Sequence, residues 1–501
     1  MTLQEWTISE LQSMMTAGEL TSHRLVELYL ERIDEIDRNG PKLNSVIETN
    51  PDALTIASSL DDERRHGKTR GLLHGIPILI KDNIDTHDRM QTTSGSLALE
   101  GHIAPRDAFI VQKLRSAGAV ILGKTNLSEW ANFRGKRSVS GWSSRGGLTR
   151  NPYALDRSAC GSSSGSAAAV AANLCAAAIG TETDGSIICP SQTNSIVGIK
   201  PTLGLWSRSG IIPIAHSQDT AGPMARTVAD AAILLGALTG VDEQDSSTKH
   251  NMKRAFKDYT QFLDKNGLRG ARIGVPRKMI GTDKRIIKIF ESCLDTMKQT
   301  GAIIVDSVDV PNFKKLGKTE MEVLHYEFKA DLNKYLAGTK ARVRTMAEII
   351  KFNEENKDRV MPYFGQEHME IAQQKSSLHE KKYRDALAKN HHLTRKEGID
   401  ATIRTYKLDA IAVPSGGPAW MIDLVNGDAT NWDMESTSPA AVAGYPNITV
   451  PAGYIFGLPV GISFFAKAWQ EPTLIKLTYA FEQATKVRKS PQFLPTASLN
   501  P

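Results

Sequence analysis

Apolar residues recur three or four positions apart over several segments, which is the spacing of an α-helix with one buried face. Leu25, Tyr29, Ile33 and Ile36 form one such face. The same spacing and its end signals predict helices over residues 8–16, 107–118, 227–239, 286–297 and 471–486. Between about 315 and 400 the chain is polar and helical, with an apolar face over residues 321–335.

Short continuous apolar runs behind glycine or proline are typical of buried strands. Such runs lie at residues 76–80, 119–126, 271–277, 302–310 and 408–415, and 445–454 with 458–466 form a predicted hairpin. The strand–helix–strand order over 76–126 predicts an α/β sheet. Residues 134–166 and 217–224 are predicted as loops, 167–180 as a helix of small residues, and 187–190 as a strand.

No internal repeat or low-complexity linker divides the chain, so we expect one domain over residues 1–501. Within it we expect N-terminal helices over 1–70 and a catalytic core over 71–310. A helical insertion or cover is expected over 315–405, followed by a return to the core sheet over 406–501.

Composition narrows the function classes. The chain is 41% hydrophobic and 23% charged, with a formal net charge of +6. It has no cluster of basic residues interleaved with aromatics, so nucleic acid is not an expected partner. The start lacks a secretory signal and no run is long enough to span a membrane. The four cysteines, Cys160, Cys175, Cys189 and Cys293, are interpreted as small buried residues in a reducing, cytoplasmic setting.

The stretch Gly161–Gly165 contains three consecutive serines and fits the pattern G-x-S-x-G. That pattern marks the nucleophile elbow of α/β-hydrolases, which would make Ser163 the nucleophile. The same residues could simply form a turn that caps a helix. His216 is the one downstream histidine in a loop beside apolar strands, and no HGGG-type sequence precedes the serines.

Lys81 ends an apolar strand, an unusual place for a residue that is rarely buried. One interpretation is an ion pair with Asp82 or Asp85. The other is a lysine whose pKa is lowered by desolvation, so that it accepts a proton from a serine. Gly185–Ser186 is a second unusual site, either a tight turn or a place where backbone N–H groups converge to hold an oxyanion.

Taken together, these segments resemble the amidase signature family. The resemblance rests on several segments and on one spacing. The segments are GIPILIKDNIDT within 71–86, the span 160–190, and residues 123–135, 217–224 and 445–466. The spacing is the 24-residue separation of Ser162 and Ser186. The resemblance covers residues 5–495 and implies an α/β fold with a mixed, twisted central sheet covered by helices on both faces.

The resemblance also implies roles. Ser186 would be the nucleophile, Lys81 the base, and Ser162 the bridge between them, held by a cis peptide bond after Gly161. The oxyanion would be held by backbone N–H groups of Thr183, Asp184, Gly185 and Ser186. Ser163 would be a supporting hydroxyl. No metal or cofactor is implied.

Two positions depart from the commonest family pattern. Asp184 places a carboxylate beside the expected oxyanion hole, so we expect its side chain to point away. Ile188 stands where many relatives carry an arginine, which disfavours small acidic substrates. The form TETDGS resembles the branch that includes bacterial peptide amidases.

The expected activity is therefore hydrolysis of a carboxylic amide, such as a peptide C-terminal amide, to acid and ammonia. Candidate pocket walls are residues 321–335, 420–424 and 431–435. The expected partner is a small-molecule or short-peptide amide, with no nucleic acid or membrane, and the expected state is a monomer or homodimer. The alternatives are an amidotransferase subunit and an esterase that uses Ser163.

Overall fold

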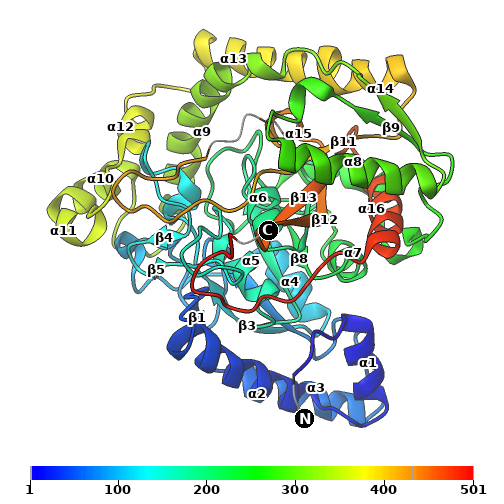
Figure 1. Ribbon diagram of the computed structural model, residues 1–501. Helices are drawn as coiled ribbons and strands as arrows, with labels where there is room; N and C mark the ends of the chain where they lie inside the picture. The colour runs from blue at the N-terminus through cyan, green and yellow to red at the C-terminus, as the bar shows by residue number, and fades with distance from the viewer. Residues whose placement is uncertain (1–2, 431–433, 435, 500–501) are drawn as a thin grey trace.

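A mixed β-sheet runs through the computed structural model, which describes residues 3–430, 434 and 436–499 (Figure 1). The strands in chain order are β1 (Val46–Thr49), β2 (Pro77–Lys81), β3 (Val120–Thr125), β4 (Trp142–Ser143), β5 (Gly147–Leu148), β6 (Ala177–Glu182), β7 (Val197–Lys200), β8 (Thr220–Ala225), β9 (Arg272–Val275), β10 (Ile303–Asp306), β11 (Ala410–Pro414), β12 (Asn447–Ile455) and β13 (Leu458–Phe465). Among the described residues, eleven strands form the sheet in the order β1-β3-β2-β6-β8-β7-β12-β13-β11-β9-β10, and β4 pairs with β5 separately.

Helices lie around this sheet. They are α1 (Ile8–Thr16), α2 (Ser22–Arg32), α3 (Ala53–Arg65), α4 (Phe109–Ser116), α5 (Ser164–Ala171), α6 (Ile188–Thr193), α7 (Val228–Ala237), α8 (Lys284–Gln299), α9 (Gly317–Ala337), α10 (Met346–Glu355), α11 (Lys357–Val360), α12 (Glu367–Gln373), α13 (Lys381–His391), α14 (Asp400–Tyr406), α15 (Ser438–Ala443) and α16 (Glu471–Thr485). Every residue of β2, β6 and β7 is buried, because elements cover both faces of the sheet there. The predicted α/β class with a mixed central sheet is confirmed.

The last hairpin of the chain joins the two halves of the sheet. β1, β3, β2, β6, β8 and β7 come from the first half of the sequence, and β9, β10 and β11 come from later segments. β12 pairs with β7 on one side, and β13 pairs with β11 on the other. In the described part of the chain, the hairpin of β12 and β13 therefore connects two groups of strands that share no other pairing.

Three local predictions were wrong at the centre of the sheet. The predicted helix over 167–180 ends at Ala171, and residues 177–182 form β6 instead. Residues 187–190, predicted as a strand, enter α6, and the predicted loop 217–224 contains the start of β8. Alanine favours helices, but β6 is buried between β2 and β8, and tertiary pairing overrides that propensity.

The segment predicted as a helical cover contains α9–α14, and α10–α13 lie at the end of the molecule opposite α1–α3 (Figure 1). Leu324, Phe328 and Leu332 of α9 pack in a buried cluster with Trp130 and Ile212. The N-terminal segment adds β1 to the sheet besides its helices. The proposed domain boundaries stay a prediction. None of the helices in the described ranges is long and apolar enough to cross a membrane.

Helix α5 approaches the backbone of neighbouring segments closely at Gly165. A Cβ there would lie 2.3 Å from the carbonyl oxygen of Ser45 and 2.5 Å from that of Asn126. Gly165→Ala is therefore expected to lower the free energy of unfolding by about 1–3 kcal/mol or more, measured by denaturant or thermal unfolding. Gly317→Ala, with no atom within 4 Å of the new Cβ, is the matched control and is expected to be neutral or slightly stabilising. Equal stability of the two variants would contradict the argument.

Candidate active site

Lys81 is the last residue of β2 and its side chain is completely buried. Its Nζ lies 2.7 Å from Ser162 Oγ, 3.0 Å from Ser163 Oγ, and 2.9 and 3.2 Å from Thr181 Oγ1 and the Thr181 carbonyl oxygen. The alternative ion pair with Asp82 or Asp85 is wrong. Asp82 accepts hydrogen bonds from the Thr93 hydroxyl and the Gly95 N–H, and Asp85 accepts one from Tyr335.

The protonation state of the Lys81 amine depends mainly on its burial. Loss of hydration lowers the pKa of Lys81 to about 7, although the carboxylates of Glu182 and Asp219 act to raise it. A neutral amine has two N–H donors and one lone pair. Of the four oxygens around it, a neutral Nζ can donate to Ser163 Oγ and Thr181 Oγ1 while its lone pair accepts the hydroxyl proton of Ser162.

The serine triplet lies against this amine. The Gly161–Ser162 peptide bond is cis, as the resemblance implied. Ser163 Oγ lies between Lys81 Nζ and the Thr181 carbonyl oxygen, to which it donates at 3.0 Å. The backbone N–H of Ser163 donates to the carbonyl oxygen of Ser186 at 3.2 Å, so Ser186 lies beside the triplet. The structure thus brings Lys81, Ser162, Ser163 and Ser186 together.

Ser186 lies in a turn between β6 and α6 and is 8% exposed. Gly185 has φ of 75°, in the left-handed region that favours glycine. Within the described part of the chain, no hydrogen bond engages the backbone N–H of Asp184, Gly185 or Ser186. Three successive free N–H groups form the kind of backbone site that can hold an oxyanion.

The side chain of Glu182 holds the end of this turn through hydrogen bonds. Its Oε2 accepts hydrogen bonds from the N–H groups of Ile187 at 2.7 Å and Ile188 at 3.0 Å, directly after Ser186. Burial raises the pKa of Glu182, and the charge of Lys200 opposes that shift. The sequence analysis did not single out this residue; a carboxylate six residues before the first residue of α6 was the available signal.

The Asp184 side chain is directed to the start of α15, where its Oδ2 accepts a hydrogen bond from Ser438 at 2.6 Å. Burial raises the pKa of Asp184 above its usual value. Asp219 was also missed. Its Oδ1 accepts a hydrogen bond from the Thr183 hydroxyl at 2.6 Å, and its Oδ2 accepts from the N–H groups of Ile214 and Ala215.

A cavity of about 800 Å³ adjoins these residues. Its wall includes Thr181, Thr183 and Asp219, and from α9 Ala330, Asp331, Lys334 and Tyr335. The expectation that α9 borders a cleft is therefore met in part. Residues 420–424 do not line this cavity. Of the candidate wall 431–435, only Met434 is among the described residues.

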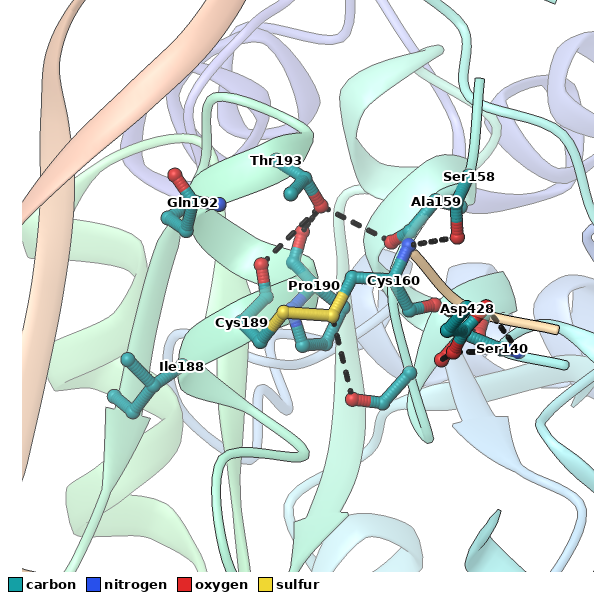
Figure 2. Close-up of a disulfide and its surroundings, with 12 residues drawn as sticks. Ser140, Ser158, Ala159, Cys160, Ile188, Cys189, Pro190, Gln192, Thr193 and Asp428 are labelled. Atoms are coloured by element: carbon teal, nitrogen blue, oxygen red, sulfur yellow. Dashed lines mark hydrogen bonds between the residues drawn. A yellow bond between two sulfur atoms is a disulfide. The ribbon is translucent and has the colours of Figure 1, made fainter. Parts of the chain in front are cut away.

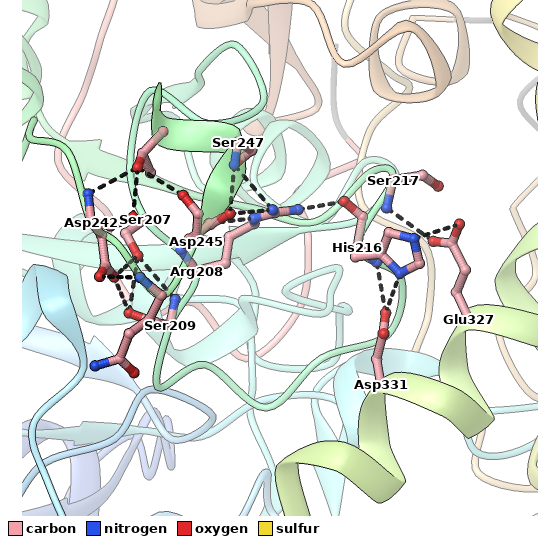
Figure 3. A network of polar contacts seen from close by, with 12 residues as sticks. Ser207, Arg208, Ser209, His216, Ser217, Asp242, Asp245, Ser247, Glu327 and Asp331 are labelled. Atoms are coloured by element: carbon pink, nitrogen blue, oxygen red, sulfur yellow. Dashed lines mark hydrogen bonds and ion pairs between the residues drawn. The ribbon is translucent and has the colours of Figure 1, made fainter. Parts of the chain in front are cut away.

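His216 has other partners than a serine. Its Nδ1 lies 2.8 Å from Asp331 and its Nε2 3.4 Å from Glu327, both on α9 (Figure 3). Burial lowers the pKa of His216, but these two carboxylates outweigh that effect and raise it. No contact among the described residues joins His216 to Ser163, so the geometry does not support the nucleophile-elbow interpretation.

The cysteine interpretation was wrong for one pair. Cys160 and Cys189 form a disulfide (Figure 2). Cys175 and Cys293 are free and buried. The bond joins the residue two positions before Ser162 to the residue three positions after Ser186. Thr193 Oγ1 also donates to the Ala159 carbonyl oxygen (Figure 2), and so does Asn194 Nδ2. The end of α6 and the serine loop, residues 159–163, are therefore held together at several points.

Comparison with known proteins agrees with this geometry. A family model described as Amidase matches residues 24–475 of the chain. The chain belongs to the amidase family. This amidase is 44% identical over 503 residues to a protein of Arabidopsis thaliana named probable amidase, covering 98% of this chain and 92% of that protein.

Two solved structures are closer in sequence. The native peptide amidase from Stenotrophomonas maltophilia is 50% identical, with a TM-score of 0.93 over 97% of this chain and 98% of that one. The peptide amidase PAM in complex with the competitive inhibitor chymostatin is also 50% identical, with a TM-score of 0.93 over 97% and 99% of the two chains. The predicted family, fold and enzyme class are confirmed.

The pKa of Lys81 predicts a pH dependence for this amidase. A base must be unprotonated, so kcat/KM is expected to rise about tenfold per pH unit below pH 7 and to level off above it. The profile of the free enzyme between pH 5 and 9 checks this. A flat profile, or a midpoint near the ordinary lysine pKa, would contradict the assignment of Lys81 as the base.

The disulfide predicts sensitivity to reductant. It closes a loop with a sequence separation of 29 residues, and opening it is expected to lower the free energy of unfolding by about 2–4 kcal/mol. Thermal unfolding with and without a phosphine reductant measures the effect. The Cys160→Ala/Cys189→Ala variant should show the lower stability without reductant and no further response to it. Identical unfolding of the wild type under both conditions would contradict the prediction.

Proposed function

We propose that this amidase hydrolyses the C-terminal primary amide of short peptides through an acyl-enzyme on Ser186. The observation that carries the mechanism is the contact of 2.7 Å between Lys81 Nζ and Ser162 Oγ, with Ser186 beside the same serine loop. A buried amine with a pKa of about 7 is a suitable base at neutral pH.

The proposed reaction runs in two halves. Ser162 passes its hydroxyl proton to Lys81 and takes the proton of Ser186 as Ser186 Oγ bonds to the amide carbon. The negative charge that develops on the carbonyl oxygen is held by the free N–H groups of the 183–186 turn. When the C–N bond breaks, the proton moves through Ser162 to the nitrogen, and ammonia leaves.

Water completes the reaction. It attacks the ester carbon of the acyl-enzyme and gives up a proton along the same route, from Ser162 to Lys81. The Ser186 Oγ–carbon bond then breaks, Ser186 regains its proton, and the carboxylic acid leaves. Ser163 would hold the Lys81 amine in place through its hydroxyl, because it bonds both Nζ and the Thr181 carbonyl oxygen.

Two observations support a peptide amide as substrate. The structures at 50% identity over nearly the whole chain are named peptide amidases, and one of them holds the inhibitor chymostatin. Residue 188, two positions after Ser186, is an isoleucine, so this position offers no guanidinium for a small acidic substrate. The expected monomer or homodimer and the cytoplasmic location stay predictions, and the disulfide removes the support that the location drew from reduced cysteines.

Ammonia release tests the proposal. The substrates are a C-terminally amidated dipeptide, free glutamine, a simple aliphatic amide and an aryl amide. Ser186→Ala is expected to lower kcat on the dipeptide amide by at least about 10⁴-fold, and Lys81→Ala nearly as much. Ser191→Ala is the matched control, since Ser191 is a buried serine on α6 whose hydroxyl has no partner among the described residues.

The outcomes separate the alternatives. Release from the small amides but not from the dipeptide amide would keep the mechanism and reject the substrate. Full activity in Lys81→Ala with loss in Ser163→Ala would favour the esterase mechanism. No release from any substrate, with a protein that co-purifies, would favour an amidotransferase subunit.

A further inference from the structure

The loop before β8 lies directly against the turn that carries Ser186. β6 and β8 pair antiparallel, with Glu182 opposite Thr220. Continuing this register past the end of β6 places residue 184 opposite residue 218. Segments that are distant in sequence therefore meet where the free N–H groups of the turn begin.

Gln218 is the residue of that loop that contacts the turn through its side-chain amide. It is 1% exposed, and its Nε2 donates to the Thr183 carbonyl oxygen at 3.3 Å and to Glu320 Oε1 on α9 at 3.0 Å. An amide nitrogen has two hydrogens, so both donations can be made at once. Gln218 thus joins the turn to the cover helix.

The contact with Thr183 has a geometric consequence one atom further along the chain. The carbonyl of Thr183 and the N–H of Asp184 belong to the same peptide unit. In a planar trans peptide the C=O and N–H bonds point in opposite directions, so a donor that fixes the oxygen also fixes the direction of the N–H. Asp219 accepts a hydrogen bond from the Thr183 hydroxyl, so it holds the side chain of the residue that precedes this peptide unit's N–H.

The other end of this connection lies in the interior of the protein. Glu320 of α9 is buried. Ser217 donates its backbone N–H to Glu327 at 2.9 Å, and the backbone N–H and Nδ1 of His216 both reach Asp331, so α9 holds the same loop at three successive residues (Figure 3).

We infer that Gln218 is a positioning residue for the oxyanion site: it aims the Asp184 N–H by holding the Thr183 carbonyl, with Glu320 of α9 as its anchor. The inference rests on the proposed function, since it assumes that the 183–186 turn holds the oxyanion. Gln218 has no contact with the reacting atoms in this scheme, and its effect is on the chemical step.

Gln218→Glu tests the inference. A carboxylate keeps the shape but cannot donate to the Thr183 oxygen. Since a misdirected oxyanion donor affects the transition state more than the bound amide, kcat is expected to fall on the order of 10²-fold with little change in KM. Gln218→Met removes the donor without adding charge, and it is expected to show the same loss and to remain folded.

The pH dependence distinguishes a donor from a structural role. A glutamate at 218 would join Glu320, Asp184 and Asp219 in one buried group, and its protonated form has an O–H donor. The ratio of Gln218→Glu to wild-type kcat is therefore expected to rise as the pH falls. The same ratio for Gln218→Met is expected to stay constant.

The chain offers a matched control. Gln366 is 2% exposed, and its Nε2 donates to the Ile350 carbonyl oxygen at 3.2 Å and to Glu354 at 3.1 Å, the same pair of acceptor types within the helical cover. Gln366→Glu is expected to keep kcat within about threefold of wild type, because it lacks a contact with the turn.

Wild-type kcat in Gln218→Met, or an equal loss in Gln218→Glu and Gln366→Glu, would overturn the inference. Wild type and Ser186→Ala are assayed beside these variants on the amidated dipeptide. If the wild type is inactive or Ser186→Ala is active, the proposed function fails; if these two behave as proposed and the Gln218 variants keep their activity, only this inference fails.

Discussion

The site depends on a buried lysine amine that is surrounded by neutral oxygens. Lys81 is buried at the end of β2, and no carboxylate of the described residues lies within ion-pair distance of its Nζ. Burying a charged ammonium under these conditions is costly, so the surroundings favour the neutral base. The neighbouring strand supplies the space: Gly180 has no side chain where Ser163 Oγ lies, and a Cβ there would come within 2.8 Å of that atom.

The rest of the site is arranged around this amine by short segments of the sheet centre. The serine loop before α5 and the turn before α6 are joined by a disulfide and by hydrogen bonds from α6. Glu182 holds the turn from the side of α6, and the loop before β8 holds it from the other. Catalytic geometry therefore does not rest on one contact, which is the arrangement that preorganised electrostatic stabilisation requires.

Much of this could be predicted from the sequence, because Lys81 breaks the polarity pattern of its strand and Ser162 and Ser186 lie in a distinctive glycine and serine context. The positioning residues could not. Gln218 and Asp219 are ordinary polar residues of a loop, and their importance depends on the β6–β8 register, which the sequence does not reveal. β6 was mistaken for helix because its alanines carry a local helix preference that burial between two strands overrides. The Cys160–Cys189 pair has no spacing that distinguishes it from free thiols.

The strand order also has a consequence for synthesis on the ribosome. The lysine, the serines and the turn have all been made once residue 225 has emerged. Among the residues that the structure describes, however, the two groups of strands are joined only by the hairpin at residues 447–465. The nascent chain thus carries its reactive groups while residues 226–446 are synthesised, on a sheet whose edge strand β7 is still unpaired on one side. Assembly of the whole enzyme waits for nearly the last segment to be made, so a chain that stops early yields two unconnected part-sheets.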